Sequence, residues 1–106
     1  MTTFDDREKA FEKKFAHDAE MQFKAQARRD RLLGLWAAEL MGLDADEAAD
    51  YAKSVVIADL EEAGDDDVYR KVSADLEAKG VPTEGLRAKM SELLAIAKAQ
   101  IMEEGV

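Results

Sequence analysis

Four basic residues lie close together in the sequence of a chain whose net charge is −9: Lys24, Arg28, Arg29 and Arg31. Guanidinium groups pair well with phosphate oxygens, so Arg28, Arg29 and Arg31 could bind a nucleotide. The sequence has no phosphate-binding motif of the form G-x-x-x-x-G-K-[ST], and nucleotide hydrolysis therefore has no support. The alternative is a solvated face whose arginines pair with acidic side chains of neighbouring helices.

Two acidic runs could suggest a cation site, but helix starts explain both of them. The run Asp44, Asp46, Glu47 and Asp50 lacks the glycine and the final glutamate of a calcium-binding loop. The second run consists of the three aspartates at 65–67, where carboxylates suit the first turn of a helix. The sequence has no cysteine, which excludes thiolate ligands. We therefore predict no metal site.

His17 is the only histidine of the chain, so it has no second imidazole with which to form a metal site. Its simplest interpretation is an exposed residue on a helix. The alternative is a pH-sensitive contact, because imidazole titrates near physiological pH. The rest of the sequence carries no catalytic motif, and we predict that the protein is not an enzyme.

The aromatic residues near the N-terminus are the clearest candidates for binding a partner. In a helix, Phe4, Phe11 and Phe15 lie on one face within an arc of about 40°. The segment could fold back so that the rings join the core of the protein. Alternatively, the rings could anchor a groove on another protein, where their burial would contribute on the order of 5–9 kcal/mol before ordering costs.

Composition and charge restrict the class of protein. Helix-forming residues are abundant and the only proline is Pro82, which together indicate one all-α domain of 106 residues. Residues 1–31 carry a net charge of +1, whereas residues 32–106 carry −10, so duplex nucleic acid is not an expected partner. No apolar run approaches the roughly 18 residues of a membrane span. We expect a cytoplasmic protein with no direct membrane insertion.

Hydrophobic periodicity predicts a four-helix bundle with short antiparallel connections and helices at about 4–41, 45–63, 66–79 and 83–103. The first helix would be about 57 Å long and the others about 20–30 Å, so it would overhang the bundle. We therefore divide the chain into an N-terminal arm, residues 1–22, and a bundle, residues 23–106. The predicted inward-facing residues are Leu32, Leu33, Trp36 and Leu40; Ala48, Ala52, Val55, Val56, Leu60 and Ala63; Val68, Val72 and Leu76; and Leu86, Met90, Leu93, Leu94, Ala97 and Ile101.

Local signals predict several details of these helices. Gly34 inside a helix indicates close packing against a neighbour, since glycine costs about 1 kcal/mol there relative to alanine. Gly42 should end the first helix in a left-handed conformation. Asp44 and Glu47 should form a capping box at the second helix, and Thr83 should cap the fourth.

Several stretches together resemble the zeta subunit of alphaproteobacterial F-type ATP synthases. The stretches are MTTFDDREKAFEKKFAHDAE at 1–20, RRDRLLGLWAAELMGL at 28–43, the turn at 61–65 and the ending AQIM at 99–102. The resemblance covers the whole chain. It implies a small four-helix protein that inhibits ATP hydrolysis by inserting its N-terminal helix into a catalytic interface beside the central stalk.

The resemblance also implies partners and contact residues. The partners would be the alpha, beta and gamma subunits of the catalytic part of the ATP synthase, on the cytoplasmic face of the membrane. Residues 32–106 would dock and orient the arm. No cofactor would be required, although ADP or ATP could act as a regulatory ligand. The inhibitory contacts would be Phe4, Arg7, Glu8, Phe11, Glu12, Lys14 and Phe15.

Two other functions remain open from the residues alone. The protein could be an adenine-nucleotide sensor that uses Arg28, Arg29 and Arg31. It could also be an oligomerisation module in which the aromatic stripes of two chains pair. The mixed charge of the arm and the lack of a sustained heptad disfavour the second possibility, so we expect a monomer.

Overall fold

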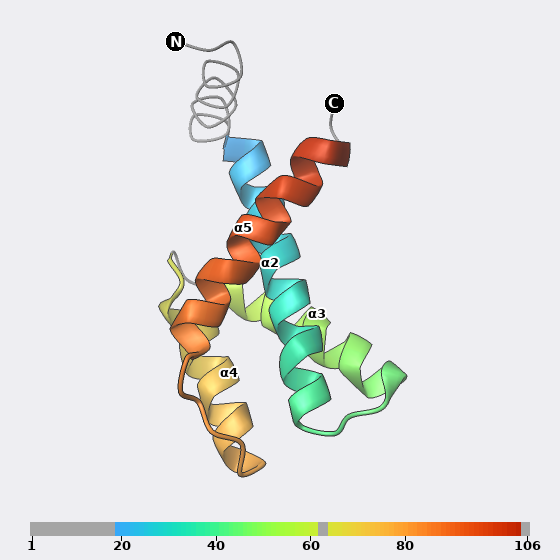
Figure 1. Cartoon of the computed structure of the whole chain (residues 1–106), viewed down its shortest axis with the longest axis vertical. Coiled ribbons are helices and arrows are strands. Elements are labelled where there is room, and N and C mark those ends of the chain that lie inside the picture. The colour runs from blue at the N-terminus through green and yellow to red at the C-terminus, as the bar shows by residue number, and fades with distance from the viewer. Residues whose placement is uncertain (1–18, 62–63, 105–106) are drawn as a thin grey trace.

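The computed structural model describes residues 19–61 and 64–104, which form four helices and no strand. They are α2 (Ala19–Leu40), α3 (Ala45–Glu61), α4 (Asp66–Ala78) and α5 (Leu86–Glu104), shown in Figure 1. The predicted all-α four-helix fold is confirmed. Within the described ranges, no helix combines the length and the apolar character needed to cross a membrane.

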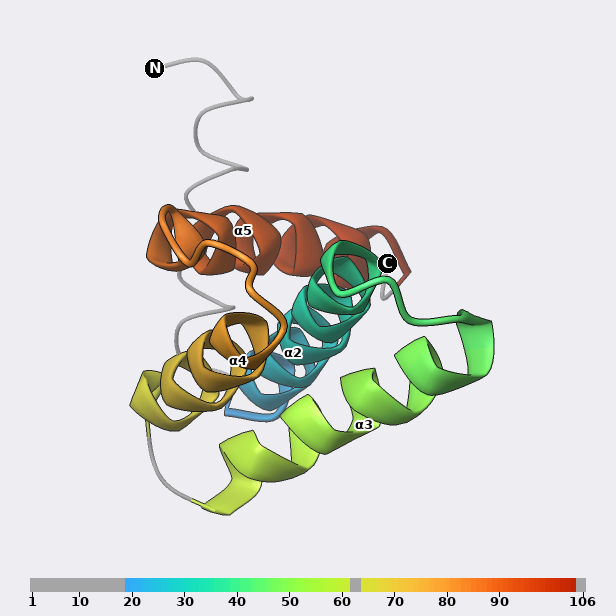
Figure 2. The same ribbon diagram turned by 90° about the horizontal axis from the view of Figure 1, so that it is seen from below.

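Helix α2 occupies the centre of the fold. Figure 2 shows it flanked by α3, α4 and α5, and it contacts all three. Its buried face meets the strict every-fourth-residue stripe of α4, Val68, Val72 and Leu76, which is fully buried as predicted. The main core cluster consists of Leu33, Ala37, Val55, Val68, Val72, Leu76, Leu86, Met90 and Leu93.

The contact between α2 and α3 depends on Gly34. A Cβ atom at this position would lie 2.5 Å from the Cα atom of Ala52 and 3.1 Å from its Cβ atom. The two helices therefore meet backbone to backbone, which only glycine permits. The predicted close packing at Gly34 is confirmed.

The connection from α2 to α3 has the predicted geometry. Gly42 has a φ of +76°, and the N–H of Leu43 donates to the Ala38 carbonyl at 3.0 Å, as in a Schellman motif. The Asp44 carboxylate accepts from the Glu47 N–H at 2.8 Å, and the Glu47 carboxylate accepts from the Asp44 N–H at 3.2 Å. This reciprocal pair is the predicted capping box.

The start of α5 differs from the prediction. The helix begins at Leu86, three residues after the predicted start, and Thr83 does not cap it. Gly85 has a φ of +78°, which a right-handed helix cannot contain, so the helix can begin only after it. The N–H of Lys89 donates to the Gly85 carbonyl at 2.9 Å, and this bond opens the helix.

Two leucines predicted to face inward are exposed instead. Leu40 is 47% exposed in the last turn of α2, and Leu60 is 61% exposed near the end of α3. Leu60 lies about 80° around α3 from Ala52, on the side away from Val55. The buried face of α3 is narrow because Ala52 rests directly on Gly34, and Leu60 falls outside it.

Candidate functional site

The residues predicted to contact a partner lie outside the described part of the chain. This holds for the seven arm residues Phe4, Arg7, Glu8, Phe11, Glu12, Lys14 and Phe15, and for His17. Their roles stay predictions, as does the boundary of the arm at residue 22. The described residues do include the whole basic cluster predicted to bind nucleotide.

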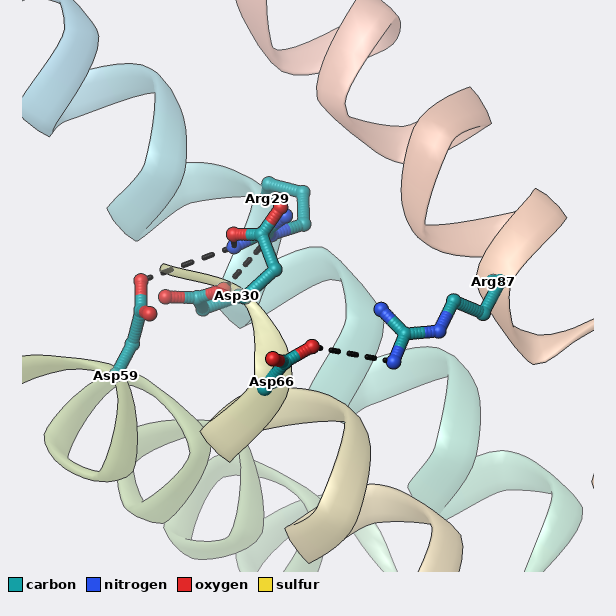
Figure 3. A network of polar contacts seen from close by, with 6 residues as sticks. Arg29, Asp30, Asp59, Asp66 and Arg87 are labelled. Carbon is teal, nitrogen blue, oxygen red and sulfur yellow. Dashed lines mark hydrogen bonds and ion pairs between the residues drawn. The ribbon is translucent and has the colours of Figure 1, made fainter. Parts of the chain in front are cut away.

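Arg29 is the central charged residue of the core, and its side chain is 1% exposed. Its Nε donates to Oδ1 of Asp30 at 2.8 Å, and its Nη2 donates to Oδ1 of Asp65 at 2.9 Å. The same Nη2 lies 3.7 Å from Oδ2 of Asp59. Figure 3 marks this ion pair with a dashed line. The guanidinium therefore links α2 to α3 and to the turn that precedes α4.

The charges around Arg29 do not balance, because one guanidinium serves three carboxylates. Burial alone would lower the pKa of Arg29, but its hydrogen bond with Asp65 and the charge of Asp30 raise that pKa overall. Arg29 therefore stays charged. Burial, and next the hydrogen bond with Asp59, raise the pKa of Asp30 to about 8, although Arg29 acts in the opposite direction.

Arg28 lies on the surface of α2. Its Nη2 is 2.7 Å from Oε2 of Glu104, and this pair ties α2 to the last turn of α5. The hydrogen bond raises the pKa of Arg28 and lowers the pKa of Glu104. Both groups therefore remain charged over a wide pH range.

Of the four basic residues predicted as a cluster, Lys24, Arg28 and Arg31 line one surface groove of about 540 Å³. It is lined by Phe23, Lys24, Ala27, Arg28, Arg31, Val56, Ile101 and Glu104. Arg28 and Arg31 therefore share one site, whereas Arg29 points into the core, and the structure does not bring the three arginines together. Nucleotide binding stays a prediction. The Arg29 guanidinium already donates its hydrogen bonds to Asp30 and Asp65.

A second hollow of about 300 Å³ lies between α2 and α3 and shares Phe23 with the groove. Its lining includes Asp30, Asp59 and Glu61 together with the exposed apolar residues Phe23 and Leu60. Sequence reasoning missed this hollow and the buried role of Arg29. A signal existed, since Arg29 continues the every-fourth-residue series of buried positions Ala25, Leu33 and Ala37.

The acidic runs mostly stabilise the fold. Asp44 and Glu47 form the capping box, whereas Asp66 pairs with Arg87 of α5 at 3.2 Å. Asp67 pairs with Arg70 within α4. Among residues 19–61 and 64–104, no group of three or more acidic, histidine or cysteine side chains could hold a metal ion.

These features define a small all-α protein with an ionic cluster inside its core and two hollows on its central helix. The comparisons with known proteins identify the family. The chain belongs to the family of ATPase inhibitor subunit zeta, whose model matches residues 1–100. Members of this family are regulatory proteins of the ATP synthase.

A solved structure supports the same fold. A structure determined by solution NMR is 57% identical in sequence and has a TM-score of 0.71. The similarity covers 79% of this chain and 98% of that chain. A search of curated proteins finds no match.

Proposed function

We propose that this protein inhibits ATP hydrolysis by the F-type ATP synthase by inserting its N-terminal helix into a catalytic interface beside the central stalk. Residues 1–22 would form the inhibitory arm and residues 23–106 the bundle, of which residues 32–106 would dock and orient the arm. The observation that carries this proposal is the family model, which includes the arm. Fully buried hydrophobic residues of the described ranges begin at Ala25, and Met21, near the end of the proposed arm, packs against the cluster of Ala25 and Ile101.

The proposal specifies the partners and the place of action. The arm contacts the alpha, beta and gamma subunits on the cytoplasmic face of the membrane-bound enzyme. The inhibitor itself catalyses no reaction and is a monomer when free. The acidic bundle does not insert into the membrane, and its net charge opposes binding to nucleic acid.

Phe11→Ala and Phe15→Ala test the arm. Each truncation should cost about 3 kcal/mol of binding if the ring is buried in the complex. This corresponds to roughly hundredfold weaker inhibition. The measurement is ATP hydrolysis by the purified synthase, titrated with each variant.

Two controls separate binding from folding. Lys13→Ala lies off the aromatic stripe and should inhibit like the parent. A chain that lacks residues 1–18 should still unfold cooperatively, because the four described helices form core clusters with one another. Unchanged inhibition by Phe11→Ala would exclude the stripe as the anchor. A large drop in melting temperature for Phe11→Ala would place the ring in the core of the protein.

The groove beside Phe23 favours nucleotide sensing as a second function. Phe23 is 56% exposed and offers a ring on which a base could stack. Arg28 and Arg31 line the same groove and could contact phosphate oxygens. ADP or ATP would then act as a regulatory ligand of the inhibitor.

Arg31→Gln tests this second function without disturbing the core. Loss of one charge-assisted hydrogen bond, worth about 1.5–3 kcal/mol, should weaken ATP binding roughly tenfold to a hundredfold. The measurement is a titration of the labelled protein with ATP, followed by NMR chemical shifts. Arg70→Gln, on α4, is the matched control and should bind like the parent. Identical titrations for both variants would remove this groove as the nucleotide site.

A further inference from the structure

The carboxyl groups of Asp30 and Asp59 contact Arg29 at different distances, and only Asp30 is close enough to accept a hydrogen bond from it. Asp30 accepts a hydrogen bond from Arg29 with Oδ1 only. Among the described residues, its buried Oδ2 has no hydrogen-bond partner when Asp30 and Asp59 are both ionised. Asp59 lies 3.7 Å from Nη2 of Arg29, which is beyond hydrogen-bond distance. Each aspartate therefore has an oxygen that the guanidinium does not satisfy, and Figure 3 shows the two side chains converging beside Arg29.

The surrounding helices do not supply the missing positive charge. From the turn before α4, Asp65 adds a third carboxylate and takes the second hydrogen bond of Arg29. From α5, Arg87 is directed to Asp66 at the start of α4, and its guanidinium also stacks on the Tyr69 ring at 4.1 Å. With all three aspartates around Arg29 ionised, the cluster would carry a net charge of −2. Asp65 is 46% exposed, so solvent screens its charge, whereas Asp30 is buried and Asp59 is only 13% exposed, and unpaired charge is strongly disfavoured at these two positions.

We propose that Asp30 and Asp59 share one proton, and that this proton forms a pH-dependent contact between α2 and α3. The Oδ2 hydroxyl of Asp30 donates to the Asp59 carboxylate, which satisfies the buried oxygen and reduces the net charge of the cluster to −1. When the proton leaves in mildly alkaline solution, two carboxylates face each other without a donor, and the contact weakens. The raised pKa of Asp30, about 8, agrees with this arrangement.

Solvent has a route to the pair. Both aspartates line the hollow of about 300 Å³ between α2 and α3, and the Asp59 side chain is 13% exposed. A proton can therefore leave without global unfolding. If the bundle positions the arm as proposed above, inhibition should weaken over the same pH range, and this last consequence rests on the proposed function.

The sign of the effect on stability follows from the direction of the shift. An unfolded aspartate has a pKa of about 3.9, whereas folding raises the pKa of Asp30 to about 8. Between these values the folded state binds a proton that the unfolded state does not. The contribution of Asp30 to stability is therefore fully present below about pH 4 and declines as the pH rises, levelling off above about pH 8.

The test compares the full-length parent with Asp30→Asn at pH 5 to 9. Asparagine keeps an acceptor for Nε of Arg29 and a permanent donor for Asp59, so the variant should fold. Relative to this variant, the unfolding equilibrium constant of the parent should rise roughly tenfold per pH unit between pH 5 and 7. Asp50→Asn, an exposed acid of α3, should follow the parent. Parallel pH profiles for the parent and Asp30→Asn would overturn the proposal.

A direct titration of the parent protein does not depend on whether the variant folds. Carbon-13 NMR of the parent should show the Asp30 carboxyl titrating near pH 8, with a coupled shift at Asp59. Titration of Asp30 near pH 4 would overturn the shared proton whatever the variants do. Neither measurement involves the synthase, so failure here is distinguishable from failure of the inhibitory function.

Discussion

Gly34→Ala is expected to destabilise the protein by about 1–3 kcal/mol, as overpacking does in a filled core. In an exposed helix the same substitution would stabilise by roughly 1 kcal/mol. The sign reverses here because the new methyl group would lie 2.5 Å from the Cα atom of Ala52, which belongs to the backbone and cannot rotate away. Helices α2 and α3 must separate to accommodate it. Urea denaturation of the parent and the variant measures the difference.

A second substitution makes this prediction specific. Ala52→Gly removes the Cβ atom that would lie 3.1 Å from the new methyl group but leaves the Cα atom at 2.5 Å, and glycine costs about 1 kcal/mol inside a helix, so the double variant should stay less stable than the parent. Leu35→Ala is the control, because Leu35 is adjacent in sequence but exposed. If Gly34→Ala is as stable as the parent, α2 and α3 do not touch through their backbones.

Arg29→Met is expected to cost about 3–5 kcal/mol of folding free energy, the range for removing one partner of a buried ion pair. Methionine keeps much of the apolar stem but leaves Asp30, Asp59 and Asp65 without a cation. The deficit relative to the parent should shrink as the pH falls towards the ordinary aspartate pKa of about 4, because protonation removes the uncompensated charge. Thermal melts across this pH range give the measurement.

Arg31→Met is the matched control for this substitution. Arg31 lies two residues after Arg29 and is exposed. Removal of its charge should change the free energy of unfolding by no more than about 0.5 kcal/mol. Equal stability of the two variants would show that Arg29 is not part of the core. A deficit that does not depend on pH would point to lost packing of the side chain and not to unpaired aspartates.

The position of Arg29 also affects how nucleotide binding should be studied. A variant that replaces Arg28, Arg29 and Arg31 together would unfold or loosen the bundle through Arg29 alone. A loss of binding in that variant would say nothing about direct contacts. Substitutions confined to Arg28 and Arg31 avoid this problem, although Arg28 also holds Glu104.

The features that could be predicted from the sequence are those that depend on neighbouring residues. The left-handed Gly42, the capping box of Asp44 and Glu47, and the stripe of α4 are set within one or two turns of chain. The close packing at Gly34 followed from the cost of glycine inside a helix. These signals located the end of α2, the start of α3 and the buried face of α4.

The features that could not be predicted depend on distant parts of the chain. The side chain of Arg29 is held inward by Asp65, 36 residues away. Its spacing from Ala25 and Leu33 is that of a buried position, but its charge favoured a solvated surface, and only the distant aspartates reverse that preference. The exposure of Leu60 results from how closely α3 approaches α2. In the loop before α5, Gly85 adopts a positive φ that overrides the capping preference of Thr83.

The placement of α2 has a consequence for synthesis on the ribosome. Ala25 is covered by Ile101, and Arg28 pairs with Glu104, 76 residues later in the chain. At about 5–20 residues per second, translation from the end of α2 to the end of α5 takes roughly 3–13 s. During that interval α3 can cover one side of α2 through Gly34 and Ala52, but the side that α5 covers stays open to chaperones and proteases. Completion of the native fold therefore waits for the last helix to emerge.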